Sequence, residues 1–151
     1  MMTRDCIFFQ LAKAHQTASR FWKDRLAPLH LTTAQATVLA FLSEEDGITS
    51  AELGKRIQLD SATLTGLINR LEAVNLVARL KDREDRRAVR VCLTPRGRGL
   101  GRQVVDLTAK AHHEFLSSLD GAADRQLTGL LEKISKPFKD SEPDRNQERP
   151  S

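Results

Sequence analysis

Tyrosine is absent from this chain of 151 residues, and only two cysteines are present, Cys6 and Cys92. Cysteines so far apart do not suggest a disulfide framework, and their spacing matches no zinc motif. No glycine-rich phosphate loop follows a predicted strand, and no motif places a nucleophile beside a base. The adjacent His112 and His113 diverge by about 100° on a helix, so they do not form the i, i+4 pair that binds a metal. The sequence therefore predicts no catalytic site, cofactor or metal, and indicates that the chain is not an enzyme.

Long hydrophobic runs are absent as well. No apolar stretch approaches the length needed to span a bilayer, and the first residues, MMTRDCIFFQ, lack a signal-peptide apolar region followed by small residues. We therefore expect a cytoplasmic protein without a membrane partner. With 40% hydrophobic residues, the chain supports one compact domain with accessory helices rather than two independent cores.

Three short helices are expected between residues 32 and 73. Capping boxes at Thr32 and Thr49 mark two helix starts, and Asp60 or Ser61 caps the third helix. One face of that third helix is apolar at i, i+3, i+4 and i+7 and consists of Leu64, Leu67, Ile68 and Leu71. The opposite face is small and polar and consists of Ser61, Thr63, Thr65, Gly66, Asn69 and Arg70. A short helix, a tight turn and such a face are typical of a helix-turn-helix that enters the DNA major groove; the alternative is an ordinary surface helix facing water.

A short basic β-hairpin is predicted directly after this helix. Strands at residues 77–81 and 88–93 flank a tip, residues 82–87, which has no apolar side chain to bury. Acidic residues between arginines hold guanidinium groups extended, and an extended arginine fits the DNA minor groove. The alternative is a merely solvated turn. The charge distribution favours DNA binding over a solvated turn, because residues 50–102 carry twelve Lys and Arg against six acids while the whole chain has a net charge of only +4.

A helix-turn-helix followed by a basic hairpin is a winged helix, and here the sequence resembles a known family. The stretch LDSATLTGLINRLEAVNLVARLKDREDRRAVRVCLTPRG is similar to the central region of the multiple antibiotic resistance regulator (MarR) family of dimeric bacterial transcription factors. The family's wing pattern, an Asp two residues before an Arg and then V-x-L-T-x-x-G, is matched by Asp85, Arg87, Val91, Leu93, Thr94 and Gly97. The string LDSATLT also resembles the organic-hydroperoxide-sensing branch. The resemblance covers about residues 30 to 100.

The resemblance implies roles for individual side chains. Arg87 would enter the minor groove with Asp85 as its orienting partner, and Arg83 and Arg86 would be phosphate or secondary groove contacts. The recognition helix would contact base edges and phosphates through Ser61, Thr63, Thr65 and Asn69. Phosphate contacts are further expected from Arg70, Arg79 and Lys81. Because Gly66 stands where the family often has a larger residue, the DNA sequence preference of relatives does not transfer to this chain.

Long amphipathic helices are expected on both sides of the winged helix. One runs from Cys6 to Leu26, another starts at Pro95, and a third follows a break at Asp120 and Gly121. These faces exceed what one small domain covers, so we predict a helical dimerisation region, residues 1–29 and 98–137, around a DNA-binding domain, residues 30–97. Two-fold symmetry would then place the recognition helices about 34 Å apart on a pseudo-palindromic operator. The alternative is an intramolecular bundle; residues 138–151 have the composition of a disordered tail.

What the protein senses is left open by the sequence. The resemblance implies a small aromatic or phenolic effector bound between the dimer helices and the winged helix, and the candidate wall residues are Phe8, His15, Trp22 and Phe115, which suit a dimer core equally well. Cys6, near a helix N-terminus, is a candidate peroxide sensor, although the tyrosines that hold the sensing cysteine in the family are missing.

The predicted fold is mostly α with a small antiparallel β-hairpin wing. The predicted function is that of a dimeric, sequence-specific DNA-binding transcriptional regulator, a repressor released by a small-molecule effector. The alternatives are a peroxide-sensing regulator that uses Cys6 and a winged helix that serves as a protein-interaction module.

Overall fold

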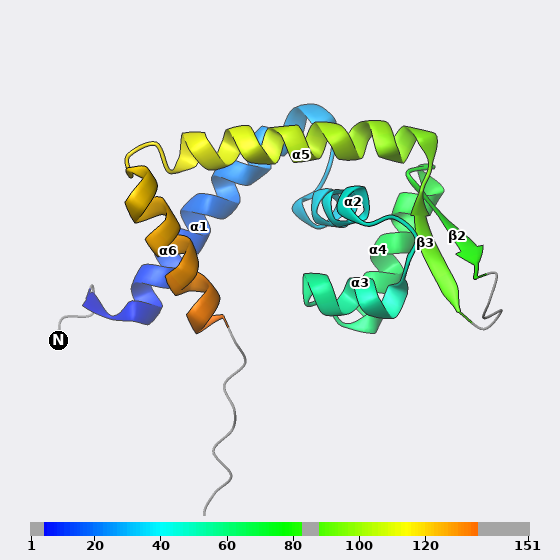
Figure 1. Cartoon of the computed structure of the whole chain (residues 1–151), viewed down its shortest axis with the longest axis horizontal. Helices are drawn as coiled ribbons and strands as arrows, with labels where there is room; N and C mark the ends of the chain where they lie inside the picture. Colours follow the sequence, from blue (N-terminus) through cyan, green and yellow to red (C-terminus); the bar gives the residue numbers. More distant parts are fainter. Residues whose placement is uncertain (1–4, 83–87, 136–151) are drawn as a thin grey trace, which may run out of the picture. The chain divides into compact units, whose positions relative to one another are not determined.

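The computed structural model describes residues 5–82 and 88–135. The elements in chain order are α1 (Ile7–Leu26), the 3-10 helix η2 (Ala27–Leu29), α2 (Thr33–Glu44), β1 (Ile48–Thr49), α3 (Ser50–Ile57), α4 (Ser61–Ala73), β2 (Val77–Lys81), β3 (Val89–Leu93), α5 (Pro95–Phe115) and α6 (Gly121–Ile134) (Figure 1). The predicted wing-tip residues Arg83, Asp85, Arg86 and Arg87 lie outside the described residues, and so does the predicted disordered tail.

The helices begin where the capping patterns predict. In α2 the N–H of Gln35 donates to Thr32 Oγ1 at 3.2 Å while the N–H of Thr32 donates to Gln35 Oε1 at 2.9 Å. Thr49 and Glu52 form the same reciprocal pair at the start of α3. Each box satisfies amides that would otherwise be left without a partner at the helix end. Both predicted capping boxes are therefore confirmed.

The sheet has three strands, one more than the predicted hairpin. The strand order is β1-β3-β2, all antiparallel, and β1 adds only the pairs Ile48↔Val91 and Thr49↔Arg90. The chain turns into β1 at Gly47, whose φ of 74° is in the left-handed region that glycine adopts readily. Asp46 Oδ1 then accepts hydrogen bonds from the N–H of Gly47 at 3.0 Å and from the N–H of Leu93 at 2.7 Å. A two-residue strand carries no alternating pattern, and its partner lies some forty positions away, so sequence periodicity does not reveal it.

Aliphatic side chains from α2, α3, α4 and the sheet make one hydrophobic core. The stripe predicted on α4 faces this core: Leu64, Leu67, Ile68 and Leu71 are at most 5% exposed. Burying side chains of this size contributes roughly 1.5–3 kcal/mol each. This packing fixes which side of α4 remains available to a ligand, and together α2, α3, α4 and the sheet form a winged helix-turn-helix.

Helix α5 packs on α2 and on α1. Leu26, Ala36 and Val104 form a second, smaller cluster there, and residues up to Phe115 make one compact unit that contains both α1 and α5. Residues from Leu116 on form a second unit, in which Asp120 caps α6 by accepting from two backbone N–H groups. The predicted break before α6 is thereby confirmed.

No single helix in residues 5–82 and 88–135 is long and apolar enough to cross a membrane, and the α1–η2 segment meets that test only jointly with α2, across a bend of 74°.

Candidate nucleic-acid interface

A tight turn joins α3 to α4. Gln58 adopts a φ of 55° and donates its N–H to the carbonyl of Gly54, and the N–H of Leu59 donates to the same oxygen at 3.1 Å. A Cβ on Gly54 would lie only 3.3 Å from the carbonyl oxygen of Leu59, so this close approach favours glycine. The turn therefore sets the angle at which α4 leaves α3 and exposes one of its faces.

That outer face of α4 carries the recognition residues predicted from the sequence. Ser61, Thr63, Thr65, Asn69 and Arg70 are exposed, and Gly66 is half-buried. An ideal Cβ on Gly66 would lie 3.9 Å from the Arg70 guanidinium, an ordinary contact. The face is consequently slim, polar and able to take a larger side chain at position 66 without a clash.

The first turn of α4 is held by its capping residue. Asp60 Oδ1 accepts from the N–H of Thr63 at 2.9 Å, and Asp60 Oδ2 accepts from the Thr63 hydroxyl at 2.6 Å. The hydroxyl bond and then the backbone bond hold the pKa of the Asp60 carboxyl below its usual range. Because the hydroxyl proton of Thr63 is engaged, its oxygen is left to accept hydrogen bonds, which favours base amino groups over phosphate as its partner.

Helix α4 and strand β2 are linked by a polar cluster that the sequence did not reveal. Arg79 Nη1 donates to Glu72 Oε2 at 2.5 Å, Arg79 Nη2 donates to Asn69 Oδ1 at 2.6 Å, and the N–H of Arg79 donates to Glu72 Oε1 at 3.2 Å. The guanidinium of Arg79, a predicted phosphate contact, ties the wing to the helix. The missed residue is Glu72: an acid seven positions before an arginine, across a helix-to-strand connection, has no recognisable sequence pattern.

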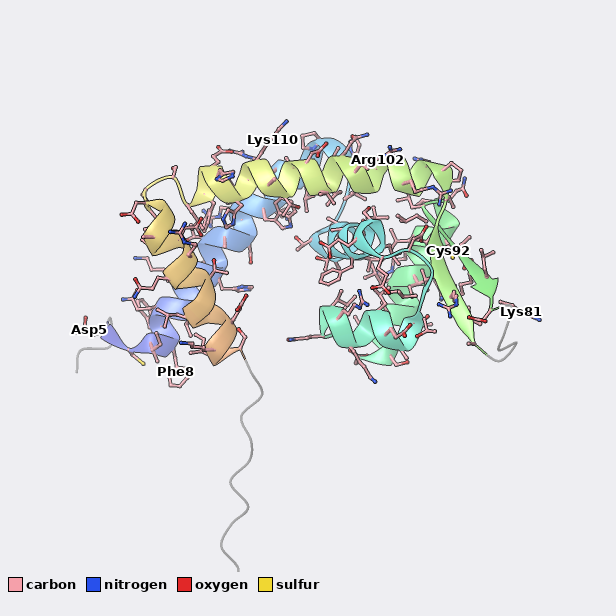
Figure 2. All side chains as sticks on the ribbon, in the orientation of Figure 1. Asp5, Phe8, Lys81, Cys92, Arg102 and Lys110 are labelled. Atoms are coloured by element: carbon pink, nitrogen blue, oxygen red, sulfur yellow. The ribbon has the colours of Figure 1, made fainter. Side chains whose placement is uncertain are left out.

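A second polar connection closes the hairpin at the end where its strands meet the predicted tip. The N–H of Asp82 donates to the carbonyl of Ala88 at 3.0 Å. Arg90 forms an ion pair with Asp82 and donates through Nη1 to the carbonyl of Gly47 at 2.8 Å. The bond to Asp82 raises the pKa of the Arg90 guanidinium. Arg90 thus holds the three strands together, while Lys81 is exposed at the end of β2, where the predicted tip begins (Figure 2).

The basic segment recognised in the sequence divides between two surfaces. Arg96, Arg98 and Arg102 lie on α5, which runs on the opposite side of α2 from α3 (Figures 1 and 2). Arg96 Nη1 donates to the carbonyl of Val74 at 3.1 Å, and Arg98 Nη1 donates to the carbonyl of Leu93 at 2.8 Å. These arginines hold the start of α5 against neighbouring elements, so the excess positive charge of residues 50–102 does not all lie beside α4.

A shallow apolar cleft of about 190 Å³ lies between α1 and α5. Among the predicted wall residues, Trp22 and Phe115 line it, whereas Phe8 and His15 lie elsewhere on α1. Phe8 is 79% exposed (Figure 2), and the ring of His15 contacts the hydroxyl of a serine one turn along the helix. A single helix spans many turns, so residues on its apolar stripe do not all reach the same cavity.

The cleft has a wall that the sequence analysis did not single out. The ring centroids of Phe21 and Phe115 are 5.1 Å apart, and the Arg25 guanidinium lies 4.6 Å above the Phe21 ring. Arg25 also pairs with Glu114, which raises the pKa of the guanidinium. His112 completes the lining. Phe21 is half-buried on α1, and its place in the cleft depends on how α1 and α5 pack together.

Cys6 and Cys92 form no disulfide with each other and are distant in the sequence. Cys6 is the N-cap residue of α1 and is half-buried, which matches the position near a helix start inferred from the sequence. Burial, and then the charge of Asp46, raise the pKa of the Cys92 thiol. Across the part of the chain that the structure describes, no group of three His, Cys, Asp or Glu side chains is placed to hold a metal ion.

Comparison with known proteins gives consistent results. Residues 31–89 match the model of the MarR family. The HTH-type transcriptional regulator TtmR of Methylorubrum extorquens is 45% identical over 92 residues, which are 61% of this chain and 47% of that protein, so the chain matches about half the length of this relative. The organic hydroperoxide resistance transcriptional regulator of Bacillus subtilis is 31% identical over 107 residues, 71% of this chain and 73% of the relative. Both are named as regulators, in agreement with the prediction that the chain is not an enzyme.

Solved structures extend the similarity to the whole fold. Bordetella bronchiseptica BpsR, whose structure concerns regulation of DNA binding by 6-hydroxynicotinic acid, aligns with a TM-score of 0.83 at 29% identity, covering 91% of this chain and 98% of BpsR. A mutant MarR from E. coli in complex with operator DNA aligns with a TM-score of 0.79 at 29% identity, and the alignment covers 89% of this chain and 99% of the MarR chain. These matches and the winged helix confirm the resemblance seen in the sequence, and the chain belongs to the MarR family.

Proposed function

We propose that this protein is a sequence-specific DNA-binding transcriptional regulator in which α4 reads the major groove and the wing reaches a minor groove. The observation that carries the proposal is the exposed polar face of α4, held in place by the Asp60 cap on one end and a buried leucine and isoleucine stripe behind it. A helix of this shape fits the major groove. The similarity to a MarR protein bound to operator DNA supports the same arrangement.

Individual contacts follow from this placement. Ser61, Thr65 and Asn69 project from the face that would meet base edges, and Arg70 and Lys81 are exposed cations suited to phosphate. Thr63 and Gly66 complete the face. At the wing tip we assign Arg87 to the minor groove with Asp85 as its orienting partner, and Arg83 and Arg86 to phosphates or the groove edge, as the family pattern implies.

We further propose that two copies of the chain bind DNA together. Ile7, Phe8 and Phe9 at the start of α1 are 58%, 79% and 47% exposed, and four apolar residues of α6 are at least 37% exposed: Leu127, Leu130, Leu131 and Ile134. Each unit thus has an apolar face that its own packing leaves in water, which marks an association surface. A two-fold dimer would place two recognition helices about one DNA turn, roughly 34 Å, apart on a pseudo-palindromic site.

Release of a repressor by a small aromatic molecule is the mode of regulation that the structure supports best. The cleft between α1 and α5 is lined by Phe21, Trp22 and Phe115, with His112 as a polar group. Aromatic walls with few polar groups are typical of small-molecule sites, and BpsR is regulated by an aromatic acid. An effector bound here would act on DNA affinity by changing how α1 and α5 pack.

The proposal is tested by selecting bound duplexes from a random pool and titrating the selected site at several salt concentrations. Loss of the wing arginine in Arg87→Ala should weaken binding about tenfold or more and reduce the salt dependence. The control is Lys110→Ala, which removes one positive charge from α5, and it should bind as the wild type does. A winged helix used only for protein interaction would select no duplex, and that outcome would refute the proposal.

A peroxide sensor is the second candidate function, because Cys6 is the residue at the N-cap position of α1 and the chain is similar to a hydroperoxide resistance regulator. A thiolate at a helix N-terminus is stabilised by free amides and the helix dipole. In Cys6→Ser, release of DNA by organic peroxide should be lost, whereas Cys92→Ser should still respond. Unchanged release from Cys6→Ser would eliminate this candidate.

A further inference from the structure

The side chain of Asn69 is held in a single orientation by its neighbours. An asparagine amide has one acceptor end and one donor end, and a guanidinium has only donors. Because Arg79 Nη2 lies 2.6 Å from the Asn69 amide, the carbonyl oxygen of that amide must face the arginine. The NH₂ group is therefore the end left to face outward from α4.

Glu72 holds the Arg79 guanidinium in place beside the Asn69 oxygen. Its carboxylate binds both Arg79 Nη1 and the N–H of Arg79, at 2.5 and 3.2 Å. The side chain of Arg79 is 27% exposed and that of Glu72 is 41% exposed, so the pair is only partly screened by water. Charge-assisted bonds with two attachment points are among the stronger hydrogen bonds in proteins. Glu72 also lies three residues after Asn69, on the same side of the helix. Arg79, on β2, therefore bonds to two side chains that are neighbours on α4.

An asparagine free to use both ends reads adenine, because its oxygen accepts from N6 while its NH₂ donates to N7. With the oxygen turned towards Arg79, the amide presents only its NH₂ group outward; this group can still donate to adenine N7, but adenine N6 is a donor and finds no acceptor beside it. Guanine O6 and N7 and thymine O4 are acceptors and suit such a group. We propose that Glu72 and Arg79 are positioning residues that fix the Asn69 amide with its NH₂ outward, so that α4 prefers guanine or thymine over adenine at the base that Asn69 faces.

This inference rests on the proposed DNA-binding function, and duplex selection tests the two separately. The base in question is defined as the position whose preference is lost in Asn69→Ala. In Arg79→Lys the positive charge is kept, but a single ammonium group that stays on Glu72 leaves the Asn69 oxygen free. The ratio of guanine or thymine to adenine at that position should fall about tenfold, within the discrimination of one bidentate contact. Lys110→Arg exchanges one cation for another at an exposed position of α5 and should leave the profile unchanged.

Asn69→Asp provides a second test that preserves the fold, since the side chains are isosteric and the new carboxylate still binds Arg79. Its outward group accepts instead of donating, so preference should move towards cytosine and adenine, whose amino groups are donors. A wild-type preference for adenine, an unchanged profile in Arg79→Lys, or no affected position in Asn69→Ala would each overturn the inference. Failure of the wild type to select any duplex would instead refute the proposed function.

Discussion

Two glycines at the start of α5 lie two residues apart and should respond in opposite ways to alanine. A Cβ on Gly97 would lie 1.9 Å from the carbonyl oxygen of Leu76 and 2.9 Å from its carbon, both backbone atoms at the start of the wing. A Cβ on Gly99 would meet nothing within 4 Å. The first substitution must push two backbones about 1.5 Å apart to reach ordinary contact, whereas the second only adds helix propensity.

The magnitude follows from three contributions. Overpacking costs about 1–3 kcal/mol, and moving the Leu76 carbonyl disturbs its hydrogen bond from the N–H of Thr94, 3.1 Å long, for about 1 kcal/mol more. Replacing a helical glycine by alanine stabilises the folded state by roughly 0.5–1 kcal/mol, which offsets part of this loss. We therefore expect Gly97→Ala to lose about 1–3.5 kcal/mol of unfolding free energy and Gly99→Ala to gain roughly 0.5–1 kcal/mol.

Urea unfolding followed by far-UV circular dichroism measures both changes at one fixed protein concentration, because a dimer's midpoint depends on concentration. With a slope of about 2 kcal/mol/M, Gly97→Ala should lower the midpoint by roughly 1 M. The same displacement moves the start of β2, so the DNA affinity of Gly97→Ala should also fall. Equal or greater stability of Gly97→Ala relative to Gly99→Ala would refute the reasoning.

Three further predictions concern other contacts. Gly101→Ala places a Cβ 2.2 Å from Ser43 Oγ, so it should destabilise the protein, and adding Ser43→Ala should recover part of the loss, with about 1 kcal/mol of coupling in a urea double-mutant cycle. Burial raises the pKa of the Cys92 thiol, so in Cys6→Ser the rate of Cys92 alkylation at neutral pH should be lower in the folded than in the unfolded protein and should increase with pH. Equal rates in the two states, measured by mass spectrometry, would contradict this. The pKa of Asp60 is lowered by hydrogen bonds from the residue three positions on, so its stabilising contribution is complete above about pH 4 and is lost as the pH falls through the lowered value; urea midpoints of Asp60→Asn should vary less with pH in that range than those of the wild type.

Much of the winged helix was predictable because its signals are local. The capping boxes at Thr32 and Thr49 depend on residues three positions apart, and the buried stripe of α4 depends on helical periodicity over a few turns. The strands of the wing were found for the same reason, within one residue of their observed bounds. Such interactions are decided by residues that are already neighbours in the chain.

The candidate site was predictable only in outline. The exposed face of α4 follows from its periodicity, but the bond between Arg79 and Asn69 joins a strand to a helix, and no local pattern indicates it. Likewise, Trp22 and Phe115 meet in one cleft while Phe8, on the same helix as Trp22, does not. Which members of a face come together depends on how two elements cross, and a single element's pattern does not contain that angle.

By itself, the sequence determined the helix starts, the apolar and polar sides of α4, the basic wing and the family, because these depend on short-range hydrogen bonds, periodicity and residue identity. Only the tertiary structure decided that Ile48 and Thr49 form a third strand, that Gly97 and Gly101 lie against neighbouring backbone or side chains, and that α5, which carries Arg102, runs on the opposite side of α2 from α3 (Figure 2). These features join residues separated by about twenty to sixty positions. Their partners are chosen by the packing of the whole core, which no local pattern specifies.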